Sequence, residues 1–347
     1  MILEYLKWRG DISFSQDRFN KIDALVLSRM IYLPFEKILR DGMTLKDVLE
    51  KLLLSKRSLK KVIMEEDVEL AKMLLTSERF YNLKMSNFVN NIDLEIEKQF
   101  SAVTVKIDNH TKIVVFRGTD NTVVGWKEDF NMSFQSHIPA QVEARNYLTY
   151  IMEKDNSDIL VAGHSKGGNL AIYSSIFIDD MYKDRIVKIY NFDGPGFNEE
   201  VVSNTGYDKI LDKIRTYIPQ SAVVGLLLER NEKPYIISSS EKYIMQHDIY
   251  SWNIDRTDFI YVDSLSKESS LLSENIKLWL SSVSVEERKE FIDLLFTTIS
   301  SINPDIKEIL TNWQQSISLL IKSSKEPVIK DMLQKSIKIF LESGLKK

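Results

Sequence analysis

The chain has 347 residues, and its 46 Lys and Arg residues against 50 Asp and Glu residues give a formal net charge of -4. This length suits one large α/β domain, or a core domain of ~250 residues with an appendage. The charge balance excludes the strong positive field that nucleic-acid-binding proteins use, so no nucleic-acid partner is expected.

Cysteine and long apolar runs are both missing from the sequence. The absence of cysteine excludes disulfides, thiolate catalysis and cysteine-based metal sites, and it fits the reducing cytoplasm. No segment approaches the ~20 uncharged apolar residues of a membrane span. We therefore expect a cytoplasmic protein without a transmembrane segment.

The opening part of the chain has the composition of helices. Apolar residues recur at helical spacing over residues 19–30, and Thr44 with Asp47 forms a capping-box pattern that starts another helix. Residues 45–98 continue with helical texture and mixed charge, and nothing in them suggests chemistry. We expect an N-terminal helical segment that covers one face of a sheet, with a cap over a pocket as the alternative for residues 45–98.

From position 100 the sequence changes to β-rich runs. Residues 102–107 and 111–116 are separated by a turn signal, which predicts a β-hairpin. The second run ends in Arg-Gly-Thr-Asp at positions 117–120. A loop that leaves a strand at a glycine and continues with a hydroxyl residue can aim a backbone N–H and a side-chain O–H at a developing oxyanion. Thr119 is therefore a candidate oxyanion donor, with a plain turn as the alternative.

Two residues just beyond this loop are candidates for supporting it. Trp126 most simply packs against the domain, and the Asp129 carboxylate can brace the loop by hydrogen bonds. We therefore treat both residues as supports of Thr119 and not as groups that react.

The most informative stretch is a strand–turn–helix pattern with a serine at its apex. Residues 159–162 predict a buried strand and residues 169–178 predict a helix, with Gly-x-Ser-x-Gly between them at positions 163–167. Glycines on both sides let the backbone turn sharply enough to expose the serine hydroxyl at a helix N-terminus. Ser165 is the candidate nucleophile, and the backbone N–H of Lys166 is the expected second oxyanion donor. A glycine-rich turn before a buried helix is the alternative.

Strands and helices alternate through the centre of the chain. A helix is predicted over residues 142–151, and strands are predicted over residues 185–192, 213–218 and 235–238. This alternation indicates a mainly parallel central sheet flanked by helices, with functional loops at the carboxyl ends of the strands. Asp193 directly follows the first of these strands, so it is expected at that edge.

A serine nucleophile needs a base, and in the fold that carries such an elbow the order along the chain is serine, acid, histidine. The chain has four histidines. His110 is in a hairpin turn, and His137 precedes the nucleophile in a loop. The elbow geometry points the side chain of His164 away from the serine. His247, in a loop after the last predicted strand, is the remaining candidate base, with a surface or N-cap histidine as the alternative.

The acid of the predicted triad is less constrained. Asp193 is the best candidate, because it ends a strand at the catalytic edge and lies between Ser165 and His247 in the chain. Asp248 adjoins the histidine, where neighbouring side chains diverge, so it could orient His247 only through an unusual local turn. A serine–histidine dyad assisted by a carbonyl or a hydroxyl is the third alternative.

Four motifs occur together in a characteristic order and spacing. They are Val-Phe-Arg-Gly-Thr at 115–119, Trp-x-x-Asp at 126–129, Gly-His-Ser-x-Gly-Gly at 163–168 and Asn-Phe-x-Gly-Pro at 191–195. Over residues 95–255 the chain resembles the class 3, fungal-type lipase branch of the α/β-hydrolases, and more closely a group of uncharacterised bacterial lipase-like proteins. The resemblance implies an α/β-hydrolase fold with Ser165 as nucleophile and His247 as base. It also implies that Thr119 and the Lys166 amide form the oxyanion hole.

Three residues depart from the pattern of those lipases. Lys166 stands where they usually carry an apolar residue, and its side chain is expected either to meet an anionic group of the substrate or to be a solvated helix residue. Asp193 stands where they usually have glycine, and Ser221 stands where they place the catalytic aspartate. The last two departures suggest that the acid has moved to the neighbouring strand end, and they also allow that catalysis has been lost.

Residues 265–347 lie outside the resemblance and are predicted to be helical. Ser284 and Glu287 form a capping box, and another helix is expected to open at Pro327. Their amphipathic stripes are expected to pack against the hydrolase domain, with a dimer or membrane-surface role as the alternative. The expected division is residues 1–264 for the lipase-like domain with its N-terminal helices, and residues 265–347 for a C-terminal helical extension.

Together these features predict a serine hydrolase that cleaves carboxylic esters, most simply lipid-like acyl esters, through an acyl-enzyme. In this mechanism His247 removes the proton from Ser165, while Asp193 orients the imidazole. No metal or organic cofactor is implied, and the expected partner is a small-molecule or lipid ester, with peripheral membrane contact as a further option. Thioester or peptide substrates are one alternative. A non-catalytic interaction or regulatory protein on a hydrolase scaffold is another, because a fold does not determine its function.

Overall fold

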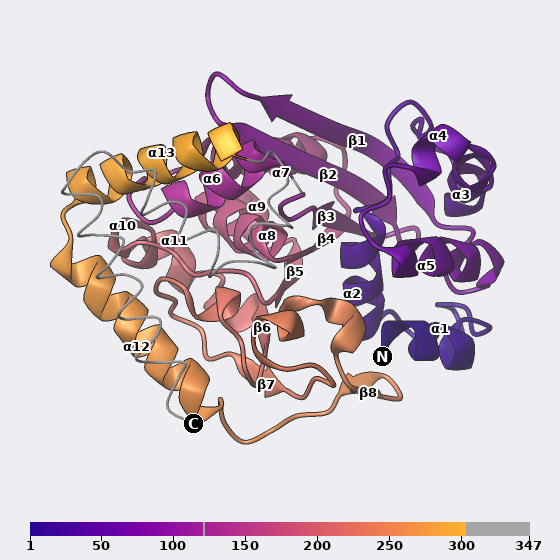
Figure 1. Cartoon of the computed structure of the whole chain (residues 1–347). Coiled ribbons are helices and arrows are strands. Elements are labelled where there is room, and N and C mark those ends of the chain that lie inside the picture. Colours follow the sequence, from indigo (N-terminus) through magenta and orange to yellow (C-terminus); the bar gives the residue numbers. More distant parts are fainter. Residues whose placement is uncertain (121, 303–347) are drawn as a thin grey trace.

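The computed structural model describes residues 1–120 and 122–302, arranged around one seven-stranded sheet (Figure 1). Its strands are β1 (Lys84–Asp93), β2 (Lys98–Lys106), β3 (Thr111–Phe116), β4 (Asp158–His164), β5 (Ile186–Phe192), β6 (Ile214–Pro219) and β7 (Tyr235–Ile237). They lie side by side in chain order. The pairs from β1 to β3 are antiparallel and those from β3 to β7 are parallel.

The register of the parallel strands aligns the ends of three of them. Phe116, the last residue of β3, pairs with Gly163 in β4. His164, which ends β4, pairs with Phe192, which ends β5. All of β4 except its first residue is buried, which explains its continuous apolar sequence. The loops that follow β3, β4 and β5 therefore begin next to one another at one edge of the sheet.

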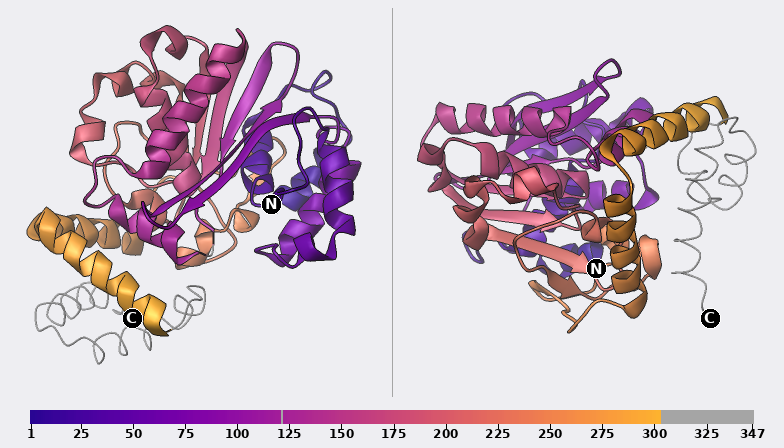
Figure 2. Two further views of the ribbon diagram at one scale, coloured as in Figure 1. Left: turned by 90° about the horizontal axis from the view of Figure 1, so that it is seen from above. Right: turned by 90° about the vertical axis from the view of Figure 1, so that its left-hand side faces the viewer.

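One face of the sheet is covered by a group of helices that we call the N-terminal layer (Figure 2, left). Its members are α1 (Ile2–Arg9), α2 (Lys21–Met30), α3 (Leu45–Leu54), α4 (Lys56–Leu59) and α5 (Glu65–Thr76). Buried side chains of α2, α3 and α5 share one apolar core with Val105, Val115 and Ala162 of the sheet. The capping box that starts α3 is present, because Thr44 Oγ1 accepts a hydrogen bond from the Asp47 N–H (3.1 Å) and the Asp47 carboxylate accepts one from the Thr44 N–H (3.1 Å).

The prediction that residues 45–98 are helical throughout is wrong for the last part of this segment. The segment from Lys84 to Asp93 forms strand β1, which pairs antiparallel with β2 from Lys106 back to Lys98. β1 is an edge strand whose positions are mostly half-buried, so its polar sequence carries no clean alternation. Pairing with β2, and not a local preference, decides its conformation. The helices of this segment, α3, α4 and α5, lie in the N-terminal layer on the face of the sheet.

The opposite face carries the helices that connect the parallel strands (Figure 2, left). They are α6 (Val123–Asn131), α7 (Pro139–Lys154), α8 (Lys166–Phe177), α9 (Asp180–Lys183), α10 (Glu199–Val202) and α11 (Thr205–Asp208). Leu148 of α7 and Leu170 of α8 belong to a second apolar core, which includes Val114 and Val161 of the sheet. With helices on both faces of a mainly parallel sheet, the chain has the α/β-hydrolase fold that the sequence predicts.

Short elements surround the last strands. They are η1 (Leu211–Lys213), η2 (Val224–Leu226), η3 (Tyr243–His247), η4 (Ile249–Ser251), β8 (Ile254–Asp255) and β9 (Asp258–Phe259). The η3 segment is held from two sides. Ser221, after β6, donates its N–H to Gln246 Oε1 (2.7 Å), and the indole N–H of the fully buried Trp252 donates to the Gln246 carbonyl (2.8 Å). These bonds fix the position of the residue that follows Gln246, which is His247.

Two helices follow the last strand, α12 (Lys267–Ser282) and α13 (Val285–Ile302), and they lie along the outside of the domain (Figure 2, right). The predicted capping box precedes α13, because the Ser284 N–H donates to the Glu287 carboxylate (2.8 Å) and the Glu287 N–H donates to Ser284 Oγ (3.2 Å). The helix expected from Pro327 lies outside the described residues. Within residues 1–120 and 122–302, no helix has the length and apolar character needed to cross a membrane.

Both helices contact the α/β part of the chain that contains the sheet. Lys277 of α12 forms an ion pair with Glu229 (2.8 Å). The rings of Phe130 in α6 and Phe296 in α13 meet edge to face, with their centroids 5.5 Å apart. α13 therefore packs on the helix that follows the Thr119 loop.

Candidate active site

Ser165 forms the turn between β4 and α8. Its backbone has φ 58° and ψ -134°, a conformation that residues with a side chain rarely adopt. The flanking glycines allow it, because a Cβ on Gly163 would overlap the backbone of Gly167, and a Cβ on Gly167 would overlap the Phe116 carbonyl. The Ser165 side chain is half-buried, and its hydroxyl makes no hydrogen bond to any residue that the structure describes. The turn thus holds an unengaged serine hydroxyl at a helix N-terminus.

The structure brings His247 and Asp193 together. His247 ends η3, and its Nδ1 lies 2.6 Å from Oδ2 of Asp193. Asp193 follows β5 with φ 51° and is fully buried, and its Oδ1 accepts a hydrogen bond from the Gly225 N–H (3.1 Å). The His247 side chain is 25% exposed, so the ring can meet a ligand while the carboxylate behind it cannot.

The environment of Asp193 sets the tautomer of His247. Burial raises the pKa of Asp193 above its ordinary value, while the hydrogen bond to His247 and the charge of Arg230 act against this rise. A carboxylate only accepts hydrogen bonds, so His247 Nδ1 carries the proton that lies between them. The neutral ring then has an unprotonated Nε2, which is the form that a general base requires.

The other candidates for the acid are engaged elsewhere. Asp248 caps η4, where its carboxylate accepts a hydrogen bond from the Tyr250 N–H (3.0 Å). Ser221, at the position where the resemblance places an aspartate, contributes its backbone N–H to Gln246. Of the two aspartates considered from the sequence, Asp193 is therefore the one whose carboxylate contacts the His247 ring.

His164 makes contacts that sequence analysis missed. The centroids of the His164 and His247 rings are 4.6 Å apart. The His164 Nε2 is 2.8 Å from the His247 carbonyl oxygen, and its Nδ1 is 3.4 Å from the Tyr32 hydroxyl. A carbonyl only accepts, so Nε2 donates and Nδ1 accepts from Tyr32. Burial holds the pKa of His164 well below its usual value, and repulsion from His247, whenever that ring is protonated, and from the Arg29 guanidinium lowers it further. His164 is a neutral support for the backbone of His247.

The two remaining histidines lie away from these groups. His137 binds the hydroxyl of Tyr173 through Nδ1 (2.8 Å), next to α8. His110 lies in the exposed turn between β2 and β3, where its backbone N–H donates to Asp108 Oδ1 (2.7 Å). Neither histidine takes part in the contacts that surround Asp193.

The loop after β3 lies against the elbow. A Cβ added to Gly118 would be 3.0 Å from the Cβ of Ser165, so the chain here passes close to the serine. The next residue along is Thr119, and the residue after the serine is Lys166. The backbone N–H of each has no acceptor among the described residues. Two free backbone donors therefore lie in the segments that meet at Ser165.

Asp129 braces the Thr119 loop, but in a way that removes one expected donor. The Thr119 hydroxyl donates a hydrogen bond to Oδ2 of Asp129. The expectation that this O–H points at an oxyanion is therefore not met, because its proton is already used. Trp126 is half-buried on α6, where its backbone N–H donates to the Thr122 carbonyl (3.2 Å).

Both interpretations of the Lys166 side chain are wrong. The side chain is fully buried, and its ammonium binds Glu128 Oε2 (2.8 Å) and Gln99 Oε1 (2.9 Å). These contacts to Gln99 in β2 and Glu128 in α6 leave the side chain with no exposed surface through which it could meet water or a substrate. A buried ammonium needs an acidic partner, and Glu128 lies 38 residues earlier in the chain. No local pattern could reveal such a pair.

Comparison with known families decides where this chain belongs. Residues 74–297, well over half of the chain, match the family described as Mbeg1-like. The chain belongs to the Mbeg1-like family. The match contains the whole sheet and also α12 and most of α13, so the Mbeg1-like region extends beyond residues 95–255, where the resemblance to lipases lies. A search of curated proteins gives no match.

The solved structures that match this chain include two fungal proteins. A mutant form of MDLA from Penicillium cyclopium is 11% identical, with 73% of this chain and 88% of that chain covered at a TM-score of 0.43. A fungal lipase in complex with an inhibitor is 12% identical, with 63% of this chain and 82% of that chain covered at a TM-score of 0.38. At these identities and TM-scores the likeness says nothing of what this chain does.

The Asp129 carboxylate has an unusual acidity. Burial raises its pKa from 3.8 to about 6, although the Lys166 ammonium and the Thr119 hydroxyl both act to lower it. The folded protein therefore binds a proton at Asp129 between pH 4 and pH 6 that the unfolded chain has released. Binding of more protons by the folded state means that stability falls as the pH rises through this window.

Asp129→Asn is expected to remove this loss of stability. From pH 4 to pH 7, the free energy of unfolding of the wild type should decline relative to that of the variant by at most about 3 kcal/mol, because the shift exceeds two pKa units. The Asn oxygen can still accept the Thr119 hydroxyl, so the loop keeps its brace. Urea unfolding of both proteins at several pH values measures the difference. A difference that stays constant over this range would contradict a raised pKa for Asp129.

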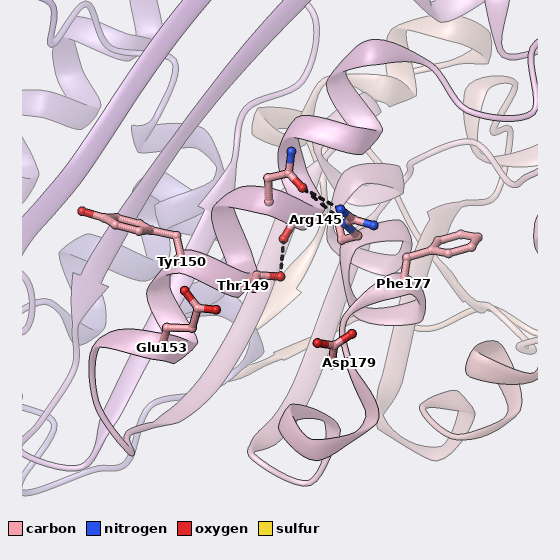
Figure 3. Close-up of a pocket in the computed structure, with 7 residues that line it drawn as sticks. Arg145, Thr149, Tyr150, Glu153, Phe177 and Asp179 are labelled. Carbon is pink, nitrogen blue, oxygen red and sulfur yellow. Dashed lines mark hydrogen bonds between the residues drawn. The ribbon is translucent and has the colours of Figure 1, made fainter.

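A shallow pocket of about 250 Å³ lies elsewhere on this Mbeg1-like domain (Figure 3). It is lined by residues of α7, among them Arg145 and Tyr150, by Phe177 at the end of α8 and by Asp179 just after it. Ser165 caps the start of α8 and Phe177 ends it, and a helix of this length spans ~18 Å. The pocket is therefore separate from the Ser165 site.

Proposed function

We propose that this Mbeg1-like chain is a serine hydrolase that cleaves carboxylic esters. The observation that carries the proposal is the hydrogen bond between the fully buried Asp193 and His247 (2.6 Å), at the same sheet edge as the strained Ser165 turn. A buried carboxylate against an imidazole sets the ring tautomer and stabilises the imidazolium that forms when the ring takes a proton. A glycine-rich turn with no catalytic role would need no such pair.

In the proposed reaction, His247 Nε2 takes the proton of Ser165 as Oγ attacks the carbonyl carbon of the ester. The resulting oxyanion accepts hydrogen bonds from the backbone N–H groups of Thr119 and Lys166. Collapse of the tetrahedral intermediate breaks the bond to the alcohol oxygen, which receives the proton from His247. Water then repeats the same steps on the acyl-enzyme, and the carboxylic acid leaves.

The surroundings of His247 favour a lipid-like substrate. Tyr243 and Met245 lie on the same short helix as His247, and these two residues are 66% and 60% exposed. Large apolar side chains exposed beside a candidate active site suit an apolar ester or peripheral contact with a lipid surface. The lack of cysteine supports a cytoplasmic setting for the reaction.

The test is covalent labelling of purified protein with a fluorophosphonate probe, followed by hydrolysis of p-nitrophenyl esters of increasing chain length. The wild type should label and should prefer longer acyl chains. Ser165→Ala and His247→Ala should abolish labelling and lower kcat by about 10⁴ or more, because the two groups act as one unit. Unfolding curves of the variants should match the wild type, since neither change removes a core side chain.

Two results would contradict the proposal. Folded wild-type protein that neither labels nor turns over any ester would favour the interpretation as a non-catalytic interaction or regulatory protein. Labelling that requires Ser165, together with turnover of thioesters or peptides in place of oxygen esters, would keep the nucleophile and change the substrate class.

A further inference from the structure

The Lys166 ammonium is a fully enclosed charge beside the candidate site. Its side chain has no exposed surface, and neither does that of its partner Glu128. Three acceptors surround Nζ: Glu128 Oε2 (2.8 Å), Gln99 Oε1 (2.9 Å) and the Gln99 carbonyl (3.1 Å). All three hydrogen atoms of the ammonium are thereby engaged, which fixes the side chain in one position.

Glu128 connects this ammonium to other elements. Its Oε2 also accepts the backbone N–H of Gln99 in β2 (3.0 Å), and its Oε1 accepts the backbone N–H of Ala140 in the first turn of α7 (2.9 Å). The Lys166–Glu128 pair therefore joins β2, α6, α7 and the start of α8 at one point. Charge-assisted hydrogen bonds of this kind are shorter and stronger than those between neutral groups.

The same pair is linked to both proposed oxyanion donors. The backbone N–H of Lys166 is one of them. The other belongs to Thr119, whose hydroxyl is held by Asp129, the residue after Glu128 in α6. The Lys166 ammonium lies 3.5 Å from Oδ1 of Asp129 as well. The Lys166 ammonium thus contacts both Glu128, to which it ties the start of α8, and Asp129, which holds the Thr119 loop.

We infer that the Lys166 side chain is a positioning residue for the oxyanion hole. It fixes the distance between the elbow and the Thr119 loop through Glu128 and Asp129, so that both backbone N–H groups converge on one oxygen atom. This inference rests on the proposed hydrolase function. Besides positioning the two donors, Lys166 contributes its positive charge. This charge offsets the two neighbouring carboxylates and so keeps the surroundings of a developing oxyanion from becoming negative.

A stabilising role alone would not require a charge at this position. Replacing a buried ion pair by apolar groups of similar volume is often neutral for stability, because burial of the two charges costs about as much as their attraction returns. The effect on catalysis is different from the effect on stability. If the pair positions the oxyanion hole, its removal displaces a donor, and loss of one oxyanion donor costs about 10² to 10³ in kcat. The two roles therefore give different results when the pair is replaced as a whole.

The test replaces both charges together, as Lys166→Met/Glu128→Gln, and compares hydrolysis of a p-nitrophenyl ester with inhibition by a trifluoromethyl ketone, which adds to the serine to form an oxyanion. We expect kcat to fall by about 10- to 100-fold and the inhibition constant of the ketone to rise by the same factor, with KM nearly unchanged. The matched control is Lys127→Met/Glu97→Gln. It removes another ion pair of α6, in which Lys127 binds Glu97 of the β1–β2 turn (2.6 Å). It should leave kcat and ketone inhibition as in the wild type.

A second variant serves if the double variant does not fold. Gln99→Met removes one acceptor of the ammonium together with a side-chain NH₂ that is buried without a hydrogen-bond partner, so the fold should tolerate it. We expect the same pattern at smaller size, a fall of about 3- to 10-fold in kcat with a matching rise in the ketone inhibition constant.

Three outcomes would overturn the inference. Unchanged kcat and ketone inhibition in a folded double variant, or in Gln99→Met, would show that Lys166 does not position the hole. A loss of activity that disappears after correction for the folded fraction would assign it a purely structural role. A wild-type protein that neither hydrolyses esters nor reacts with a fluorophosphonate would overturn the proposed function itself, and the inference with it.

Discussion

Asp193→Asn is expected to lower kcat for ester hydrolysis by about 10³ to 10⁴ with little change in KM. The contacts of Asp193 determine how the amide would lie. The Gly225 N–H donates to Oδ1, so the amide oxygen takes that place, and the amide NH₂ takes the place of the oxygen that faces His247. An NH₂ group donates to Nδ1 and moves the ring proton to Nε2. His247 then cannot accept the proton of Ser165.

Steady-state kinetics with the best p-nitrophenyl ester measure this effect, and a thermal unfolding curve verifies that the variant is folded. The matched control is Asp248→Asn, the neighbouring acid. Asn caps a helix about as well as Asp, so this variant should keep the hydrogen bond to the Tyr250 N–H and should retain activity close to the wild type. If Asp248→Asn lost activity and Asp193→Asn kept it, our assignment of the acid would be wrong.

The parts of this molecule that could be predicted from the sequence are those whose signal is local. β4 is a continuous apolar run because both faces of a central parallel strand are buried. The elbow requires Gly163 and Gly167, since a side chain at either position would overlap neighbouring backbone. The end of β5 placed Asp193 at the same edge, because parallel strands end together. In each case a few consecutive residues contain the whole physical reason.

The parts that could not be predicted depend on partners far away in the chain. The sequence around Lys166 is that of an ordinary helix. Its partner Glu128 lies 38 residues earlier in the chain, and only the fold brings the two together. His164 reads as a residue that points away from the serine, and only the fold brings the Tyr32 hydroxyl, 132 residues earlier, to its ring. The burial of a charge or of an imidazole is a property of the surrounding layers, and their packing leaves no pattern near the residue itself.

Asp67→Ala is expected to lower the free energy of unfolding by about 3 to 5 kcal/mol, the largest stability effect that we predict. Asp67 is fully buried in α5, and its carboxylate binds the guanidinium of Arg29 in α2 through two hydrogen bonds (2.6 and 2.7 Å). It also accepts the hydroxyl of Tyr250 (2.9 Å). Removal of the carboxylate leaves a guanidinium unpaired between the rings of Tyr32 and Tyr250.

This cluster also connects the N-terminal layer to the candidate site, because Tyr250 follows His247 by three residues. Urea unfolding separates the contributions. Tyr250→Phe should cost about 1 kcal/mol, the value of one hydrogen bond, whereas Arg29→Met combined with Asp67→Leu should recover most of the loss, because no charge is then left buried. A loss below about 1 kcal/mol in Asp67→Ala would mean that the Arg29 guanidinium finds water or another acceptor. The full loss, with recovery in the double variant, would make the N-terminal layer a required part of the fold that holds His247 in place.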